Sequence, residues 1–198
     1  MPHLHLAEPS PWVVRFAPLI QPGGTVLDVA CGTGRHARFL AARGHPVEAV
    51  DRDAKALEQL AGTPGVTTMR ADLESDPWPF GGRRFGAIVV TNYLHRPLFP
   101  TICEALADGG VLLYETFMRG HEAIGRPTNP HFLLEPGELL AAFAALTVVA
   151  FEQGRVTDPW PAAVQRLCAA KGVPAETIRL PAPAAPAPPE RKRRPAAP

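Results

Sequence analysis

Short apolar runs alternate with amphipathic segments through the first 115 residues of the chain. Val26–Val29, Val47–Val50 and Val66–Arg70 are rich in β-branched residues, which is typical of short strands. Asp51 ends the second run, and Asp72 follows the third. The runs at 85–92 (FGAIVVTN) and Val111–Glu115 have the same character. Strands that alternate with helix-length segments predict βαβ units, a mostly parallel sheet and right-handed crossovers.

Helical spacing of apolar residues marks several of the intervening segments, and two of these segments stop at Gly44 and Gly62. A glycine directly after the last periodic residue is a common helix end. Helical segments are predicted at Pro11–Leu19, Arg35–Arg43, Ala54–Ala61, Leu98–Ala107 and Gly137–Ala145.

The pattern changes in the last third of the chain. Residues 118–137 mix proline, glycine, histidine and arginine without periodicity, and two further strands follow at Thr147–Val156 and Ala163–Ala170. The six residues between these strands are too few for a helical crossover, so they predict an antiparallel hairpin. Eight prolines among the last 26 residues predict a tail without stable structure. The expected organisation is one domain over 1–172 and a basic tail over 173–198.

Composition narrows the class of protein. The chain has 198 residues, 46% hydrophobic residues and a net charge of +1, of which the run Glu190–Arg194 supplies +3. The remainder is slightly acidic, which argues against a polyanion-binding domain. Three scattered cysteines form no zinc motif and predict a reduced, cytoplasmic protein. The first residues lack the pattern of a secretory signal, and the longest apolar stretch, 13 residues, is too short for a membrane span.

The glycine-containing corner after the first predicted strand is the main candidate binding site. Gly32 to Ala37 satisfies G-x-G-x-x-A, and Asp51 follows about 20 residues after the glycines, so a dinucleotide is one candidate ligand. Asp28, at the end of the strand, would repel a pyrophosphate and attract an ammonium or sulfonium group. After residue 150 the chain offers only a hairpin and a tail, without the second half that a dehydrogenase needs.

The stretch VLDVACGTGRHA resembles the first motif of class I S-adenosylmethionine-dependent methyltransferases. The resemblance covers about residues 10–171, and the phrase CGTGRHARFLAARGHPVEAVD is similar, more narrowly, to small tellurite-resistance-type methyltransferases. It implies a Rossmann-like α/β fold: a doubly wound, seven-stranded mixed sheet, parallel except for one strand near the edge, with helices on both faces. It also implies S-adenosylmethionine as the cofactor.

Four positions along the chain match the family's cofactor contacts. By resemblance, Asp51 would take the two ribose hydroxyls, Asp72 would lie near the adenine amino group, and Leu73 would lie beside the adenine ring. The glycines would let the loop approach the ligand, because they carry no Cβ. The cofactor-binding residues implied in this way are Asp28, Ala30, Gly32, Gly34, Asp51, Arg52, Asp72, Leu73 and Asn92.

The acceptor side should lie beyond the fourth and fifth strands, because open parallel sheets bind ligands at the carboxyl ends of their strands. Tyr93 and His95 are candidate catalytic residues that would border the transferred methyl group, with His95 as a possible general base. Residues 118–135 could form a lid, in which Arg119 and Arg126 would hold an anionic acceptor. Asn92 is followed by Tyr93, Leu94 and His95, without the two prolines of the [NDS]-P-P-[YF] pattern of nucleic-acid amino-methyltransferases, so methylation of nucleic-acid bases is disfavoured.

The sequence therefore predicts methyl transfer to a small, possibly anionic acceptor by in-line displacement, without a metal ion or a membrane. Two alternatives stay open: an NAD-type oxidoreductase, and a catalytically silent methyltransferase-like binding protein. The identity of the acceptor and the oligomeric state are not specified by the sequence.

Overall fold

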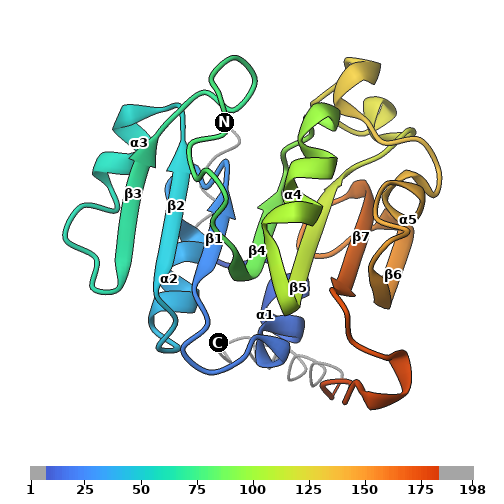
Figure 1. Ribbon diagram of the computed structural model, residues 1–198. Coiled ribbons are helices and arrows are strands. Elements are labelled where there is room, and N and C mark those ends of the chain that lie inside the picture. The colour runs from blue at the N-terminus through green and yellow to red at the C-terminus, as the bar shows by residue number, and fades with distance from the viewer. Residues whose placement is uncertain (1–7, 183–198) are drawn as a thin grey trace, which may run out of the picture.

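The protein, described by a computed structural model over residues 8–182, is built on one seven-stranded sheet (Figure 1). The strands are β1 (Val26–Val29), β2 (Val47–Asp51), β3 (Val66–Arg70), β4 (Phe85–Thr91), β5 (Leu106–Phe117), β6 (Thr147–Val156) and β7 (Ala162–Ala170). Their order is β3-β2-β1-β4-β5-β7-β6. The first five strands pair in parallel, and β7 runs antiparallel to both β5 and β6. The expected fold class is confirmed, including the hairpin.

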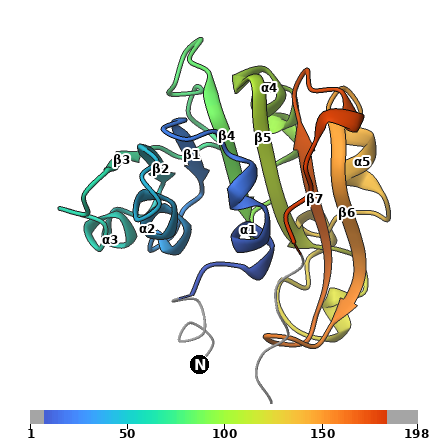
Figure 2. The same cartoon turned by 90° about the horizontal axis from the view of Figure 1, so that it is seen from below.

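Helices cover both faces of the sheet (Figures 1 and 2). One face carries α1 (Pro11–Phe16), α2 (Arg35–Ala41) and α3 (Ala54–Glu58), and the other carries α4 (Phe99–Ala105) and α5 (Glu138–Ala142). The remaining helical turns are short 3-10 segments at Ala17–Leu19, Arg96–Leu98, His121–Ala123, Pro130–Phe132 and Ala175–Thr177.

Alternation along the buried strands builds two hydrophobic cores, because successive side chains point to opposite faces. In β1, Val26 packs with the cluster that includes Trp12 and Leu40, whereas Leu27 packs with the cluster that includes Phe99. All five of these apolar side chains are at most 8% exposed. The central strands are nearly continuous apolar runs in the sequence because both faces of the sheet are buried.

Element ends differ from the expectation where glycines and turns intervene. Strand β5 begins at Leu106 and not at Val111, because Leu106 already pairs with Phe85 across a register shift. Gly109 has a φ of 77° within this stretch, a value that only glycine adopts without strain. Helices α2, α3 and α5 end two to three residues earlier than expected, in turns, and helix ends are the least predictable part of a helix.

The carboxyl ends of the parallel strands meet at one edge of the sheet, at the top of Figure 1, and the segment between β5 and α5 lies beside them. Two residues directly after strands, Ala30 after β1 and Asn92 after β4, have φ values of 51° and 54°. A left-handed backbone conformation at a non-glycine residue costs about 1–3 kcal/mol, and such residues are found mostly at functional sites. This edge is therefore where a site is expected.

Two expectations concern other parts of the chain. No helix within residues 8–182 is long and apolar enough to cross a membrane. The basic run at 190–194 lies outside the described residues.

Candidate functional site

A pocket of about 190 Å³ opens at the carboxyl ends of β1, β2 and β3, and we call it the acidic pocket. Its lining residues are Ala30, Asp51, Arg52, Ala71, Asp72, Leu73, Glu74 and Tyr93. Five of the nine residues expected at the cofactor thus share this pocket, and Tyr93, expected at the acceptor, joins them. Ala71 and Glu74 were not predicted, although they flank Asp72 and Leu73 directly in the sequence.

Asp51, the last residue of β2, is fixed by backbone amides. The Gly32 N–H donates to Asp51 Oδ2 at 2.7 Å, and the Asp53 N–H donates to Oδ1 at 2.9 Å. Each carboxylate oxygen has further lone pairs after accepting one bond. Asp51 is therefore held in one orientation by the glycine loop and can still accept hydrogen bonds from two hydroxyls of a ligand.

Asp72 and Glu74 add two further carboxylates to the lining of the acidic pocket. Asp72 Oδ1 accepts the N–H of Glu74 at 3.1 Å, and Asp72 Oδ2 lies 3.8 Å from the Arg52 guanidinium. The pocket thus holds three carboxylates, Asp51, Asp72 and Glu74, against one guanidinium. A pyrophosphate would be repelled by this charge, whereas hydroxyl, amino and sulfonium groups would be attracted.

The two motif glycines serve different purposes. A Cβ placed on Gly32 would enter open space with no heavy atom within 4 Å, beside the Asp51 carboxylate that its N–H binds. A Cβ on Gly34 would come within 2.3–2.5 Å of Leu60 side-chain atoms. Gly32 therefore keeps space open above the loop, and Gly34 lets the loop pack against the residues after α3. The prediction that a glycine here admits a ligand is compatible with the open space at Gly32, whereas Gly34 has a packing reason.

Asp28 does not line the acidic pocket. It is 1% exposed near the end of β1, and its Oδ2 has no hydrogen-bond partner within residues 8–182. Burial raises the pKa of this carboxyl to about 7, and the backbone N–H of Ala37 is the main opposing influence. The acidic character expected from Asp28 is thus supplied by Asp51, Asp72 and Glu74, and Asp28 lies beneath the glycine loop.

Two more pockets continue from the acidic pocket along the same edge of the sheet. The junction pocket, about 230 Å³, shares Glu74 and Tyr93 with the acidic pocket. The aromatic pocket, about 280 Å³, shares Asn92 and Phe117 with the junction pocket. Tyr93 and Asn92 therefore stand at the two passages. The Tyr93 hydroxyl is buried and has no hydrogen-bond partner in the part of the chain that the structure describes.

The backbone at Asn92 and Tyr93 is held firmly. The Asn92 N–H donates to the Glu115 carbonyl at 2.9 Å, and the Tyr114 hydroxyl donates to the Tyr93 carbonyl at 3.0 Å. Burial raises the pKa of the Tyr93 phenol, and the nearby Glu74 and Asp72 raise it further. Tyr93 is thus a neutral donor at the passage. His95, the other expected catalytic residue, is half-buried and lines none of these three pockets.

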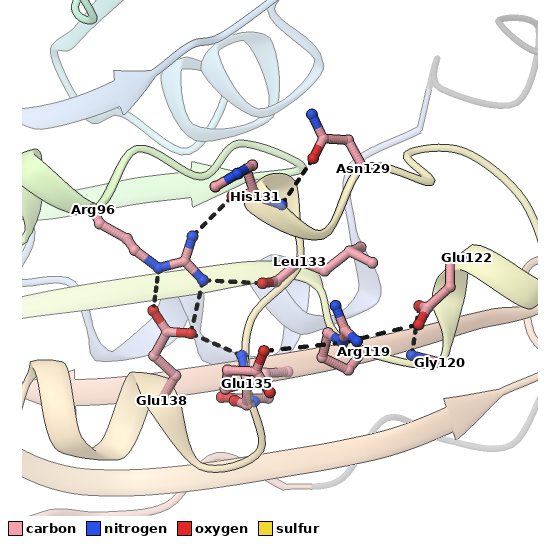
Figure 3. Close-up of polar contacts among 10 residues, drawn as sticks. Arg96, Arg119, Gly120, Glu122, Asn129, His131, Leu133, Glu135 and Glu138 are labelled. Atoms are coloured by element: carbon pink, nitrogen blue, oxygen red, sulfur yellow. Dashed lines mark hydrogen bonds and ion pairs between the residues drawn. The ribbon is translucent and has the colours of Figure 1, made fainter.

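Arg96 clamps the segment between β5 and α5 (Figure 3). Its guanidinium binds both Glu138 carboxylate oxygens, with Nε 2.6 Å from Oε1 and Nη2 2.9 Å from Oε2. It also donates to the carbonyls of His131 and Leu133 at 2.8 and 3.0 Å. These four bonds tie the end of β4 to the segment that supplies Phe132 to the junction pocket.

The arginines expected to hold an anionic acceptor are placed differently. Arg119 Nε lies 3.9 Å from carboxylate oxygens of both Glu122 and Glu135, as Figure 3 shows. Arg126 is exposed and lines none of the three pockets. The lid itself remains a prediction, and the contacts of Arg96 show that this segment is tied down in the structure.

A polar network supports the floor of the aromatic pocket. Glu115, Arg166 and Glu152 are direct neighbours across β5, β7 and β6, and Arg166 Nε lies 2.7 Å from Glu115 Oε2. The Ser10 hydroxyl donates to Glu115 at 3.0 Å, and the Ser10 N–H donates to His36 Nε2 at 3.1 Å. Sequence reasoning placed Glu115 at the end of the fifth strand but missed its partners, because Ser10 lies 105 residues away.

Comparison with known proteins now supplies a family. A model for the methyltransferase domain matches residues 3–161. A search of curated proteins finds no match. Among solved structures, TehB from Haemophilus influenzae superposes with a TM-score of 0.68 at 20% identity, over 80% of this chain and 61% of TehB. The chain thus spans less than two thirds of the length of that protein.

Two further structures share the fold. A TehB-like SAM-dependent methyltransferase from Corynebacterium glutamicum gives a TM-score of 0.61 at 19% identity, over 81% of this chain and 87% of that one. The glycopeptide N-methyltransferase MtfA, solved with S-adenosyl-L-homocysteine, gives 0.60 at 20% identity, over 84% and 91% of the two chains. At these identities the likeness establishes a common fold.

Proposed function

The chain belongs to the methyltransferase-domain family, and from this membership we propose that it moves a methyl group from S-adenosylmethionine to a small-molecule acceptor. When bound, S-adenosylmethionine supplies a methyl group activated by its sulfonium, which an acceptor lone pair takes in line while the carbon–sulfur electrons return to sulfur. The protein's own task is to align the two molecules and exclude water, and the proposal includes no metal ion.

One observation carries this proposal: the acidic pocket suits an adenosine with a positively charged substituent. Asp51, Asp72 and Glu74 face a single guanidinium there. Asp51, oriented by two backbone amides, matches the carboxylate that binds ribose hydroxyls in the family. Asp72 and the 8%-exposed Leu73 offer an acceptor and an apolar surface for an adenine ring. The open space above Gly32 leaves room for a ligand beside Asp51.

The remaining predicted cofactor contacts have supporting roles in this proposal. Arg52 orients Asp72 through their 3.8 Å ion pair. Ala30 forms the pocket wall with left-handed backbone. Asp28 and Gly34 act beneath the loop, since neither lines the pocket.

Tyr93 and Asn92 act at the boundary between cofactor and acceptor. Tyr93 lines both the acidic and the junction pocket, and its buried hydroxyl has no hydrogen-bond partner among the described residues. Asn92 lines both the junction and the aromatic pocket. We therefore assign the positioning of the acceptor to these two residues. The role of His95 as a general base remains a hypothesis, and it requires a movement of the acceptor toward the start of the 3-10 turn at Arg96–Leu98.

The proposal extends to the organisation and location of the protein. The catalytic domain would span residues 1–172, which contains the family match. A cytoplasmic location is supported by Cys31, Cys103 and Cys168, all of which are free thiols.

Calorimetric titration with S-adenosylhomocysteine and, in parallel, NADH tests the proposal. We expect one S-adenosylhomocysteine per chain and no heat of binding from NADH, because the acidic pocket repels a pyrophosphate. Binding of NADH alone would refute the proposal in favour of the oxidoreductase alternative. Binding of S-adenosylhomocysteine without turnover on any acceptor of a broad panel would favour the catalytically silent alternative.

A further inference from the structure

We propose that the acceptor is a small aromatic molecule without negative charge, held in the aromatic pocket and reaching the acidic pocket through the junction pocket. This inference rests on the proposed function and deepens it. Its basis is the continuity of the three pockets, the aromatic side chains along them and the balance of charge at their walls.

Continuity gives the acceptor a route. Tyr93 belongs to both the acidic and the junction pocket, and Asn92 and Phe117 belong to both the junction and the aromatic pocket. A molecule in the aromatic pocket can therefore extend a reactive group past Asn92 toward Tyr93. The volume of about 280 Å³ is at the lower end of small-molecule sites, which hold about 300–1,000 Å³. It suits one or two rings.

Aromatic side chains from three separate segments surround this route. Phe117 comes from the end of β5, Trp160 from the turn between β6 and β7, and Phe132 from the segment that Arg96 clamps. Phe132 is 47% exposed, although it belongs to a residue type that is usually buried. Aromatic ligands gain from edge-to-face or offset stacking with such rings.

The charge at the walls argues against an anion. The charged residues that line the aromatic pocket are Glu8, Arg35, Glu115, Asp158 and Arg166, three acids and two bases. The junction pocket adds Glu74 and no base. An anionic acceptor would therefore meet a net negative wall along the whole route.

Both guanidiniums of the aromatic pocket are already engaged. Arg166 binds Glu115 at 2.7 Å and Glu152 at 3.3 Å. Arg35 donates to the Glu8 carbonyl at 3.2 Å, and Glu115 is the carboxylate that acts on it most strongly. With Arg119 paired to two glutamates outside these pockets, the expectation of an anion-binding arginine finds no support here.

Binding of naphthol and naphthoate to the protein saturated with S-adenosylhomocysteine tests the inference, because the two probes share a ring system and differ in charge. Calorimetry should show that naphthol binds at least about tenfold more tightly than naphthoate. Trp160→Ala and Phe132→Ala should each weaken naphthol binding about fivefold or more, with unchanged affinity for S-adenosylhomocysteine. Val148→Ala is the matched control, because Val148 is 43% exposed and lines none of these pockets.

Equal or tighter binding of naphthoate would overturn the inference, as would naphthol binding that neither aromatic substitution weakens. Both failures leave the binding of S-adenosylhomocysteine intact, so they leave the proposed function standing. If S-adenosylhomocysteine itself does not bind to the unmodified protein, the proposed function fails, and the inference fails with it.

Discussion

Asp28 should destabilise the protein at neutral pH, and Asp28→Asn should therefore stabilise it. The carboxyl is 1% exposed, and its Oδ2 has no hydrogen-bond partner among the described residues. Burial raises its pKa from 3.8 to about 7. At about 1.4 kcal/mol per pKa unit, this difference corresponds to about 4 kcal/mol of unfolding free energy. Asparagine keeps the shape and an oxygen for the Ala37 N–H, and it also leaves one polar atom unpartnered.

The gain should depend on pH in a defined direction. Below pH 3.8 both folded and unfolded Asp28 are protonated, so the carboxyl has no effect on stability. Between pH 3.8 and 7 the folded protein retains the proton that the unfolded chain releases, so stability falls as pH rises. Asp28→Asn should thus gain about 4 kcal/mol above pH 7, about half of that at pH 5.5, and about 1 kcal/mol at pH 4.5.

Urea unfolding of the wild type and of Asp28→Asn at about pH 4.5, 5.5 and 8 measures how the stability gain depends on pH. Asp108→Asn, at an exposed residue near the start of β5, is the control and should change stability by less than about 0.5 kcal/mol at every pH. A stability gain that is the same at all three pH values, or a loss at pH 8, would refute the reasoning.

Three further predictions concern the loop and the clamp. Asp51→Asn should weaken S-adenosylhomocysteine binding about 100-fold in calorimetry, because charge-assisted hydrogen bonds contribute about 1.5–3 kcal/mol each. The control Asp53→Asn should leave the affinity unchanged. Equal losses of affinity in the two variants would argue against a direct contact between Asp51 and the ligand. Gly34→Ala should lower the free energy of unfolding by about 2–4 kcal/mol, because its Cβ would overlap Leu60 at a φ of 78°; a chemical denaturation midpoint equal to the wild type would contradict this. Arg96→Ala should lower the free energy of unfolding by about 2–3 kcal/mol, because the Glu138 carboxylate and two backbone carbonyls lose their donor. An unchanged thermal midpoint would show that Arg96 does not hold the segment between β5 and α5.

The sequence predicted the layered sheet well, because the central strands are mostly apolar and buried on both faces, and glycines follow α2 and α3 within a few residues. Strand β5 was predicted too short, because its first residues include the turn-forming Asp108-Gly109-Gly110 and still pair through Leu106. Local signals cannot reveal a strand that continues across a glycine-containing bulge.

The acidic pocket was largely predictable and the acceptor side was not. Asp51, Asp72 and Leu73 follow strands whose carboxyl ends must meet at one edge, so their proximity follows from topology. The floor of the aromatic pocket joins Ser10 to Glu115 and Glu115 to Arg166, pairs separated by 105 and 51 residues. Asp28 was placed correctly on its strand, but its burial depends on how α2 packs above it, which no local pattern specifies.

The crystal structure of the complex with S-adenosylhomocysteine tests the central claim most directly. The account predicts that the adenosine occupies the acidic pocket, with its ribose hydroxyls about 3 Å from the Asp51 carboxylate and its adenine beside Leu73. A complex in which the ligand lies outside this pocket, or in which Asp51 contacts only Gly32 and Asp53, would contradict it.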